Sequence, residues 1–128
     1  MDIEWIRAFC LALPHTTEDI QWGNDLLFRV GRKIYASVCL DPASPSRLSF
    51  KCTPEEFAML IEQEGISPAA YVARYHWVSL ERLDALPREE LKRLVRDSYQ
   101  MVLARLPKSV QAQLGNRKKK PARRSKKR

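Results

Sequence analysis

The C-terminal end of the chain carries a run of positive charge suited to binding polyanions. The last twelve residues, RKKKPARRSKKR, contain no acidic side chain. Nine of them are basic: Arg117, Lys118, Lys119, Lys120, Arg123, Arg124, Lys126, Lys127 and Arg128. Such a run binds nucleic acid by displacing counterions condensed on the phosphates, without reading the bases. The pattern therefore favours sequence-nonspecific attachment to DNA or RNA, and the alternative is a tail that only adds solubility.

The charge of the chain is divided sharply by position. The 128 residues have a formal net charge of +8 and a pI near 9.7. Without the tail, residues 1–116 hold 14 Lys and Arg against 15 Asp and Glu, a net charge of −1. The high pI thus describes the tail and not the body. Because residues 117–128 lack large apolar side chains, we expect them to be disordered.

A second candidate surface comes from strand alternation, which places basic and aromatic side chains together on the face opposite the core. This set is Arg29, Lys33, Tyr35, Lys51, Tyr75 and Trp77. The same alternation directs to the core Phe28, Val30, Ile34, Ala36, Val38, Leu48, Phe50, Val78 and Leu80. Basic residues interleaved with aromatics suit phosphate contact plus base stacking, at about 1–3 kcal/mol per stacked base. The alternative is the ordinary polar face of a half-exposed antiparallel sheet, with Trp77 turned inward and His76 outward.

Residues that could support catalysis or metal binding are few. His76 has no carboxylate or nucleophile at a recognisable spacing, so we interpret it as structural. Cys10, Cys39 and Cys52 are odd in number and lack CxxC spacing, which argues against a disulfide framework or a zinc site. Neither of the common glycine-rich nucleotide-binding motifs occurs. We therefore expect no enzyme activity, no cofactor and no metal.

The same sequence contains no run of about 18 apolar residues, so no membrane span is expected. Asp2 and Glu4 stand where a secretion signal would carry positive charge. These features, with three unpaired cysteines, predict a cytoplasmic protein whose tail would also allow association with the nucleoid.

The elements that must position these residues can be read from periodicity, caps and breakers. Helices are expected at 3–13, from Pro54 to a stop at Gly65, and at 87–106, with a helical turn in 66–73 and two further turns at 108–114. Strands are expected at 18–22, 26–30, 33–40, 47–52 and 75–80. Asp2 is the expected cap of the first helix, and Thr53 with Glu56 forms a capping box for the second. Gly31-Arg32 suits a tight hairpin turn of the II′ kind.

The order of these elements is α-β(3–4)-α-β-α. Helices and strands alternate too rarely for a doubly wound parallel sheet. We expect a two-layer α+β fold, with a mostly antiparallel sheet and helices packed on one face. Its parts are a domain at 1–107, a helical extension at 108–116 and a basic tail at 117–128.

Several local signatures, in order along the chain, resemble the MmcQ/YjbR family of small bacterial proteins over roughly residues 2–107. They are Leu13-Pro14, Trp22-Gly23, Phe50-Lys51-Cys52-Thr53-Pro54-Glu55, Arg74-Tyr75-His76-Trp77, Leu86-Pro87, Leu94-Val95, Ser98-Tyr99 and Leu106-Pro107. The resemblance implies a domain similar to CyaY or to type III secretion chaperones. The family is commonly labelled DNA-binding because of a proposed double-wing surface, and it has no established catalytic residues. The basic tail is not part of the family pattern.

Two functional hypotheses follow. The first is a non-enzymatic nucleic-acid-binding protein, with the tail providing affinity and the open sheet face a contact surface. The second is a protein-interaction or chaperone-like module that forms a homodimer or holds a partner segment on the open sheet.

Overall fold

The computed structural model describes residues 3–21, 23–69 and 75–119. In chain order the elements are α1 (Glu4–Ala12), β1 (Thr16–Gln21), β2 (Asp25–Val30), β3 (Lys33–Cys39), β4 (Leu48–Lys51), α2 (Pro54–Leu60), β5 (Ile66–Pro68), β6 (Trp77–Leu80), the short 3₁₀ helix η2 (Leu83–Ala85), α3 (Arg88–Ala104) and α4 (Lys108–Lys119). The expected helix at 3–13 and the long helix at 87–106 are confirmed, each slightly shorter than expected. The proposed cap Asp2 lies outside the described residues.

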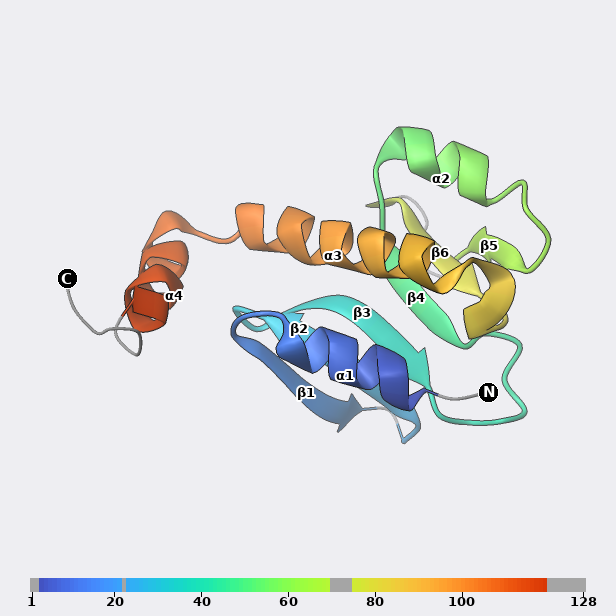
Figure 1. Cartoon of the computed structure of the whole chain (residues 1–128), viewed down its shortest axis with the longest axis horizontal. Coiled ribbons are helices and arrows are strands. Elements are labelled where there is room, and N and C mark those ends of the chain that lie inside the picture. The colour runs from blue at the N-terminus through green and yellow to red at the C-terminus, as the bar shows by residue number, and fades with distance from the viewer. Residues whose placement is uncertain (1–2, 22, 70–74, 120–128) are drawn as a thin grey trace.

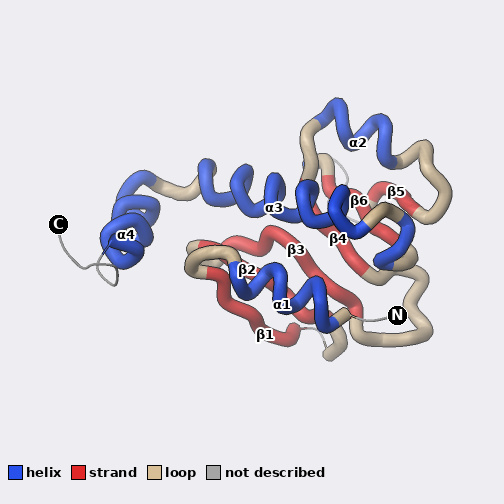
Figure 2. The backbone as a smooth tube through the Cα atoms, viewed as in Figure 1, coloured by secondary structure: helices blue, strands red, loops and turns tan. Residues whose placement is uncertain are grey.

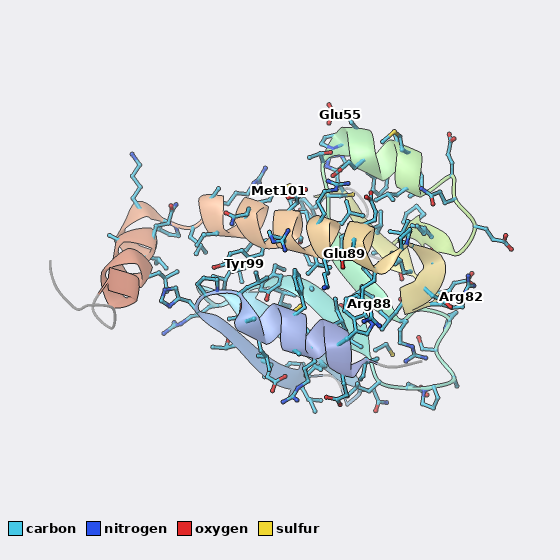
Figure 3. All side chains as sticks on the ribbon, viewed as in Figure 1. Glu55, Arg82, Arg88, Glu89, Tyr99 and Met101 are labelled. Carbon is cyan, nitrogen blue, oxygen red and sulfur yellow. The ribbon has the colours of Figure 1, made fainter. Side chains whose placement is uncertain are left out.

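Six strands form one antiparallel sheet in the order β1-β2-β3-β4-β6-β5. Helices α1 and α3 lie side by side on one face of this sheet, as Figures 1 and 2 show. The guanidinium of Arg88, an α3 residue labelled in Figure 3, lies over the Trp5 ring of α1, 4.6 Å from the ring centroid. The α+β class and the antiparallel sheet with helices on one face are therefore confirmed.

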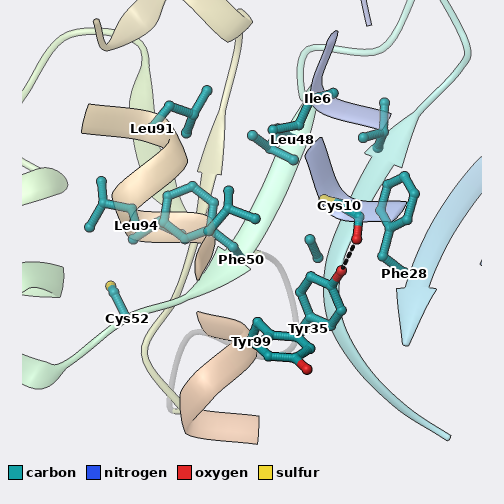
Figure 4. Close-up of a cluster of buried hydrophobic side chains, with 14 of the residues drawn as sticks. Ile6, Cys10, Phe28, Tyr35, Leu48, Phe50, Cys52, Leu91, Leu94 and Tyr99 are labelled. Atoms are coloured by element: carbon teal, nitrogen blue, oxygen red, sulfur yellow. Dashed lines mark hydrogen bonds between the residues drawn. The ribbon is translucent and has the colours of Figure 1, made fainter. Parts of the chain in front are cut away.

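The core fills the space between this helical layer and the sheet (Figure 4). Strand alternation correctly assigned to it Phe28, Val30, Ala36, Val38, Leu48, Phe50, Val78 and Leu80, all 0% exposed. From the helices, Ile6 and Cys10 of α1 and Leu91 and Leu94 of α3 face these strands. Apolar burial of this kind provides most of the free energy that holds the two layers together.

The start of α2 confirms Thr53 as its cap, because the Thr53 hydroxyl accepts a hydrogen bond from the Glu56 N–H at 3.1 Å. The Glu56 carboxylate binds Arg93 of α3 at 3.0 Å, so it ties α2 to α3. The helix ends at Leu60, earlier than expected. Gly65, with a φ of 86°, instead leads into β5.

The expected helical turn at 66–73 is wrong over its first part, which is the strand β5. Ile66 pairs with Leu80 of β6, and the Ala69 N–H donates to the Trp77 carbonyl at 3.0 Å. Without this pairing, the backbone groups on the outer side of β6, such as the Trp77 carbonyl, would have no hydrogen-bond partner in the sheet. The strand also places the Ile66 side chain in the core. Residues 70–73 lie outside the described residues.

The β2–β3 turn is a type I′ turn rather than the expected II′ turn. Gly31 has a φ of 56° and Arg32 a φ of 73°. Positive φ at both central residues defines type I′, whose twist matches that of the two strands. Type II′ would need it only at Gly31.

Helix α4 lies at one end of the molecule, beyond the end of α3 (Figure 1). Leu114 anchors it and is 9% exposed. Because α4 continues to Lys119, the expected boundary between helical extension and tail falls inside a helix. None of the helices within the described ranges has the length and apolar composition that a membrane crossing needs.

Candidate nucleic-acid interface

A bulge in β3 changes which side chains reach the open face of the sheet. Phe28 of β2 opposes Ala36, but the next residue, Arg29, opposes Ile34. Tyr35 is therefore the extra residue on its strand, and such a residue reverses the alternation beyond it. Ile34 consequently lies on the open face instead of in the core, and the prediction for this residue is wrong.

Tyr35 turns into the core, so its expected place on the open face is also wrong. Its side chain is 0% exposed and packs edge-to-face against Tyr99 at 5.3 Å between ring centroids. The Tyr35 hydroxyl donates to the Cys10 carbonyl at 3.2 Å and lies 2.8 Å from the Thr16 hydroxyl (Figure 4). Burial raises the pKa of Tyr35 well above its ordinary value.

The two hairpin residues predicted for the open face, Arg29 and Lys33, lie on opposite sides of the sheet. Lys33 opposes Val30, a core residue, so the exposed Lys33 side chain lies on the helix side. Arg29 lies on the open side, where its Nε donates to Asp19 at 3.0 Å and its Nη1 to the Arg32 carbonyl at 3.0 Å. Hydrogen bonds from Gln21 and then Arg29 lower the pKa of Asp19, so Arg29 is partly neutralised.

Three of the predicted residues, Lys51, Tyr75 and Trp77, do come together. Lys51 directly opposes Trp77 across β4 and β6, which places both on the open face. The Lys51 Nζ donates to the Tyr75 carbonyl at 2.7 Å, and partial burial lowers the pKa of Lys51. Tyr75 is 49% exposed.

The neighbouring His76 points to α2. Its ring lies edge-to-face against Phe57 at 5.6 Å, and its carbonyl accepts from the Cys52 N–H at 2.9 Å. Of the two orientations that the sequence left open, the structure therefore has Trp77 on the open face.

A second cluster lies where the β2–β3 hairpin meets α4, and it adds Arg32 and His15, which the sequence patterns missed, to the predicted Arg29. A cavity of about 830 Å³ opens there, and its charged lining consists of Arg29, Arg32 and the Asp19 carboxylate that pairs with Arg29, beside His15 and Gln113. His15 Nε2 is buried and has no hydrogen-bond partner among the described residues. Two cations beside a turn are visible in the sequence, but the packing of α4 against that turn is not.

Of the nine basic tail residues, Arg117, Lys118 and Lys119 lie in α4, the helix that lines this cavity. The other six, in the range 120–128, lie outside the described residues. The start of the tail and the hairpin cations therefore belong to the same end of the molecule.

Comparisons with known proteins agree with this fold. A family model described as YjbR matches residues 11–101. The crystal structure of the Deinococcus radiodurans protein DR2400, assigned the domain model DUF419, is 31% identical, with a TM-score of 0.77 over 88% of this chain and 87% of that one. A Pseudomonas syringae protein of known structure is 24% identical, with a TM-score of 0.65 over 79% of this chain and 98% of that one. No curated protein matches.

Proposed function

The chain belongs to the YjbR family, and from this premise we propose that it is a non-enzymatic protein that binds nucleic acid without sequence preference. The observation that carries the proposal is the segregation of charge, with nine cations in residues 117–128 and a net charge of −1 in residues 1–116. We place its action in the cytoplasm, in association with the nucleoid.

The tail supplies most of the affinity in this proposal. If all nine cations engaged duplex DNA, the slope of log K against log salt would approach about −8. Such binding needs no particular base sequence, and no helix-turn-helix or zinc module is recognisable in the sequence.

The hairpin end of the sheet supplies a second set of contacts. Arg29 and Arg32 line the cavity that α4 closes, so phosphates held by the tail would pass near them. On the open face, Lys51 and Trp77 offer a smaller contact surface next to Tyr75, and the Lys51 amine already binds the Tyr75 carbonyl. The proposed order of importance is therefore the tail, then the hairpin end, then the open face.

The proposal is tested by titrating the full chain against duplex DNA, single-stranded DNA and RNA at several salt concentrations. A variant with all nine tail cations changed to Gln should lose most of its affinity and most of its salt dependence. Arg32→Gln should weaken binding to every sequence alike and reduce the salt slope by about 1. Lys108→Gln, an exposed change on α4 outside the tail, is the matched control. Absence of binding by the full chain at low salt would reject the proposal.

A protein-interaction module is the second candidate, and the uncovered face of the sheet favours it. Sedimentation of the full chain at several concentrations tests this directly. A homodimer that Trp77→Arg dissociates would support the interaction module. A chain that remains monomeric at every concentration would argue against a homodimer through this face.

A further inference from the structure

A row of serine side chains crosses the open face of the sheet. Ser37 of β3 opposes Ser49 of β4, Ser49 opposes Ser79 of β6, and Ser79 opposes Ser67 of β5. Directly opposed residues in an antiparallel ladder project from the same face. Four hydroxyls from four adjacent strands therefore stand in one line. These four serines line a cavity of about 600 Å³, which we call the serine cleft.

One wall of the serine cleft is the second half of the β3–β4 connection, residues 44–47. The Cys39 N–H donates to the Arg47 carbonyl at 2.9 Å, and the Arg47 N–H donates to the Leu80 carbonyl at 2.7 Å. The Ser46 hydroxyl is hydrogen-bonded to the Ser79 hydroxyl. These bonds hold the wall in place, so the cleft is formed before any ligand arrives.

Apolar and aromatic side chains line the cleft on both sides of the serine row. Leu27 and Ile34 lie at the β2–β3 side of the row, Pro68 and Ala69 at the β5 side, and Trp77 beside Ser79 on β6. Leu27 is 1% exposed although it lies outside the core between the sheet and the helices. The cleft therefore combines a line of hydroxyls with flat apolar surface, the combination that holds a polar ring by its edge and its face.

The charges around the cleft disfavour anionic ligands. Among the described residues that line it, Arg47 is the one cation, and its guanidinium donates to the carbonyls of Cys39 and Asp41. Two carboxylates, Asp25 and Glu81, also line the cleft. A phosphate group placed here would meet two negative charges and a single cation, whose Nη1 already donates to two backbone carbonyls.

We propose that the serine cleft binds an uncharged small molecule whose ring carries hydroxyl or amide groups, of the class of sugars and nucleosides. Serine hydroxyls both donate and accept, so one row can satisfy the mixed donors and acceptors on the edge of such a ring. The cleft volume lies within the range of about 300–1,000 Å³ typical of small-molecule sites. The cleft shares Trp77 with the proposed open-face contacts, but it is separate from the tail and hairpin cations, because it selects against the phosphate that those cations would bind.

The test is a titration of the isotope-labelled full chain, followed by amide NMR. The probes are adenosine, uridine and the methyl glycosides of glucose and N-acetylglucosamine, each beside its phosphate monoester. At least one neutral probe should shift the backbone amides of Ser37, Ser49 and Ser79, and its phosphate ester should bind at least about tenfold more weakly. Comparison of the nucleoside and glycoside arms identifies which kind of ring the cleft prefers. No shift with any neutral probe at millimolar concentration, or tighter binding of the ester, would overturn the proposal.

Substitutions in the cleft locate the binding. Ser37→Ala combined with Ser49→Ala should weaken the neutral probe about tenfold, the effect of two lost hydrogen bonds. Ser49→Leu should abolish binding by filling the cleft. Ser109→Ala, an exposed serine change on α4, is the matched control. The thermal transition of each variant is recorded first, so that lost binding is distinguished from lost folding. Unchanged affinity in both cleft variants would remove the serine row from the site.

Discussion

Ser98 of α3 joins β3 to β4 one residue beyond their last pair, Ala36 with Phe50: its hydroxyl donates to the Tyr35 carbonyl at 2.6 Å and accepts from the Lys51 N–H at 3.0 Å. Ser98 is 0% exposed, so water does not replace these bonds. Tyr35 and Lys51 lie just beyond the end of the β3–β4 pairing, and Ser98 provides the partner for the Tyr35 carbonyl and for the Lys51 N–H. A single polar side chain in the helical layer thus stabilises the irregular part of the sheet.

Ser98→Ala should lower the free energy of unfolding by about 2–4 kcal/mol, because one buried carbonyl and one buried N–H each lose their partner. Urea denaturation measures this loss. The exposed control Ser109→Ala should change stability by less than about 0.5 kcal/mol. A loss in Ser98→Ala as small as that of the control would contradict the bridging role.

Gly31→Ala should destabilise the fold more than Gly23→Ala. Both glycines have positive φ, 56° and 86°, so each alanine incurs a similar backbone cost of about 1 kcal/mol. A Cβ at Gly31 would lie 2.4 Å from Leu106 Cδ1, whereas a Cβ at Gly23 meets nothing within 4 Å. The overpacking should add about 1–3 kcal/mol at Gly31.

Urea denaturation of both variants gives the comparison. The Gly31→Ala/Leu106→Ala double variant identifies the cause, because truncation of Leu106 should cost less in the Gly31→Ala background than in the natural chain. Strict additivity of the two changes would exclude the contact with Leu106 as the source.

The Arg7–Glu18 pair should make stability depend on acidic pH. Arg7 donates through Nε at 2.9 Å and through Nη2 at 2.6 Å to the two carboxylate oxygens. These hydrogen bonds hold the pKa of Glu18 below its ordinary value. Since the folded pKa is the lower one, the stabilisation is present above the ordinary pKa of Glu and is lost as pH falls through the folded value.

Arg7→Gln should therefore destabilise the fold only slightly at neutral pH, as expected for a largely solvated pair. The difference from the natural chain should shrink below about pH 4. Thermal unfolding across the acidic range measures it, with Lys108→Gln as the control. A difference that does not change with pH would show that Arg7 acts by packing alone.

The three cysteines should differ in their reactivity toward iodoacetamide. Cys10 is 0% exposed and Cys52 2% exposed, and burial raises their pKa values to about 12 and about 11. Cys39 is partly exposed and lines the serine cleft. Because the thiolate is the reactive form, Cys39 should be alkylated first at mildly alkaline pH.

Peptide mass mapping over time gives the order of alkylation. In Cys39→Ser, alkylation of Cys10 and Cys52 should require global unfolding. Their alkylation rate should therefore fall as the free energy of unfolding rises. Labelling of Cys10 as fast as Cys39 in the natural chain would contradict the packing of α1 on the sheet.

Local patterns in the sequence were enough to predict most of the helices and strands. Alternation in 26–30 and 47–52 placed the core residues of the sheet, and Thr53 marked the start of α2. The charge of residues 117–128 is also a property of composition, independent of any fold. Each of these features depends on neighbours within a few residues, which is why it can be read along the chain.

The features that the tertiary structure decided all depend on residues distant in sequence. Tyr35 enters the core because a bulge forms against β2 and because Ser98, 63 residues later, binds its carbonyl. The serine row exists only because four strands align at one level, and strand register is set by pairing and packing rather than by composition. Where the sequence predicted a basic and aromatic face, the structure has a cleft lined mostly by neutral side chains. Arg29 and Arg32 of the hairpin instead lie next to α4, at the end of the sheet.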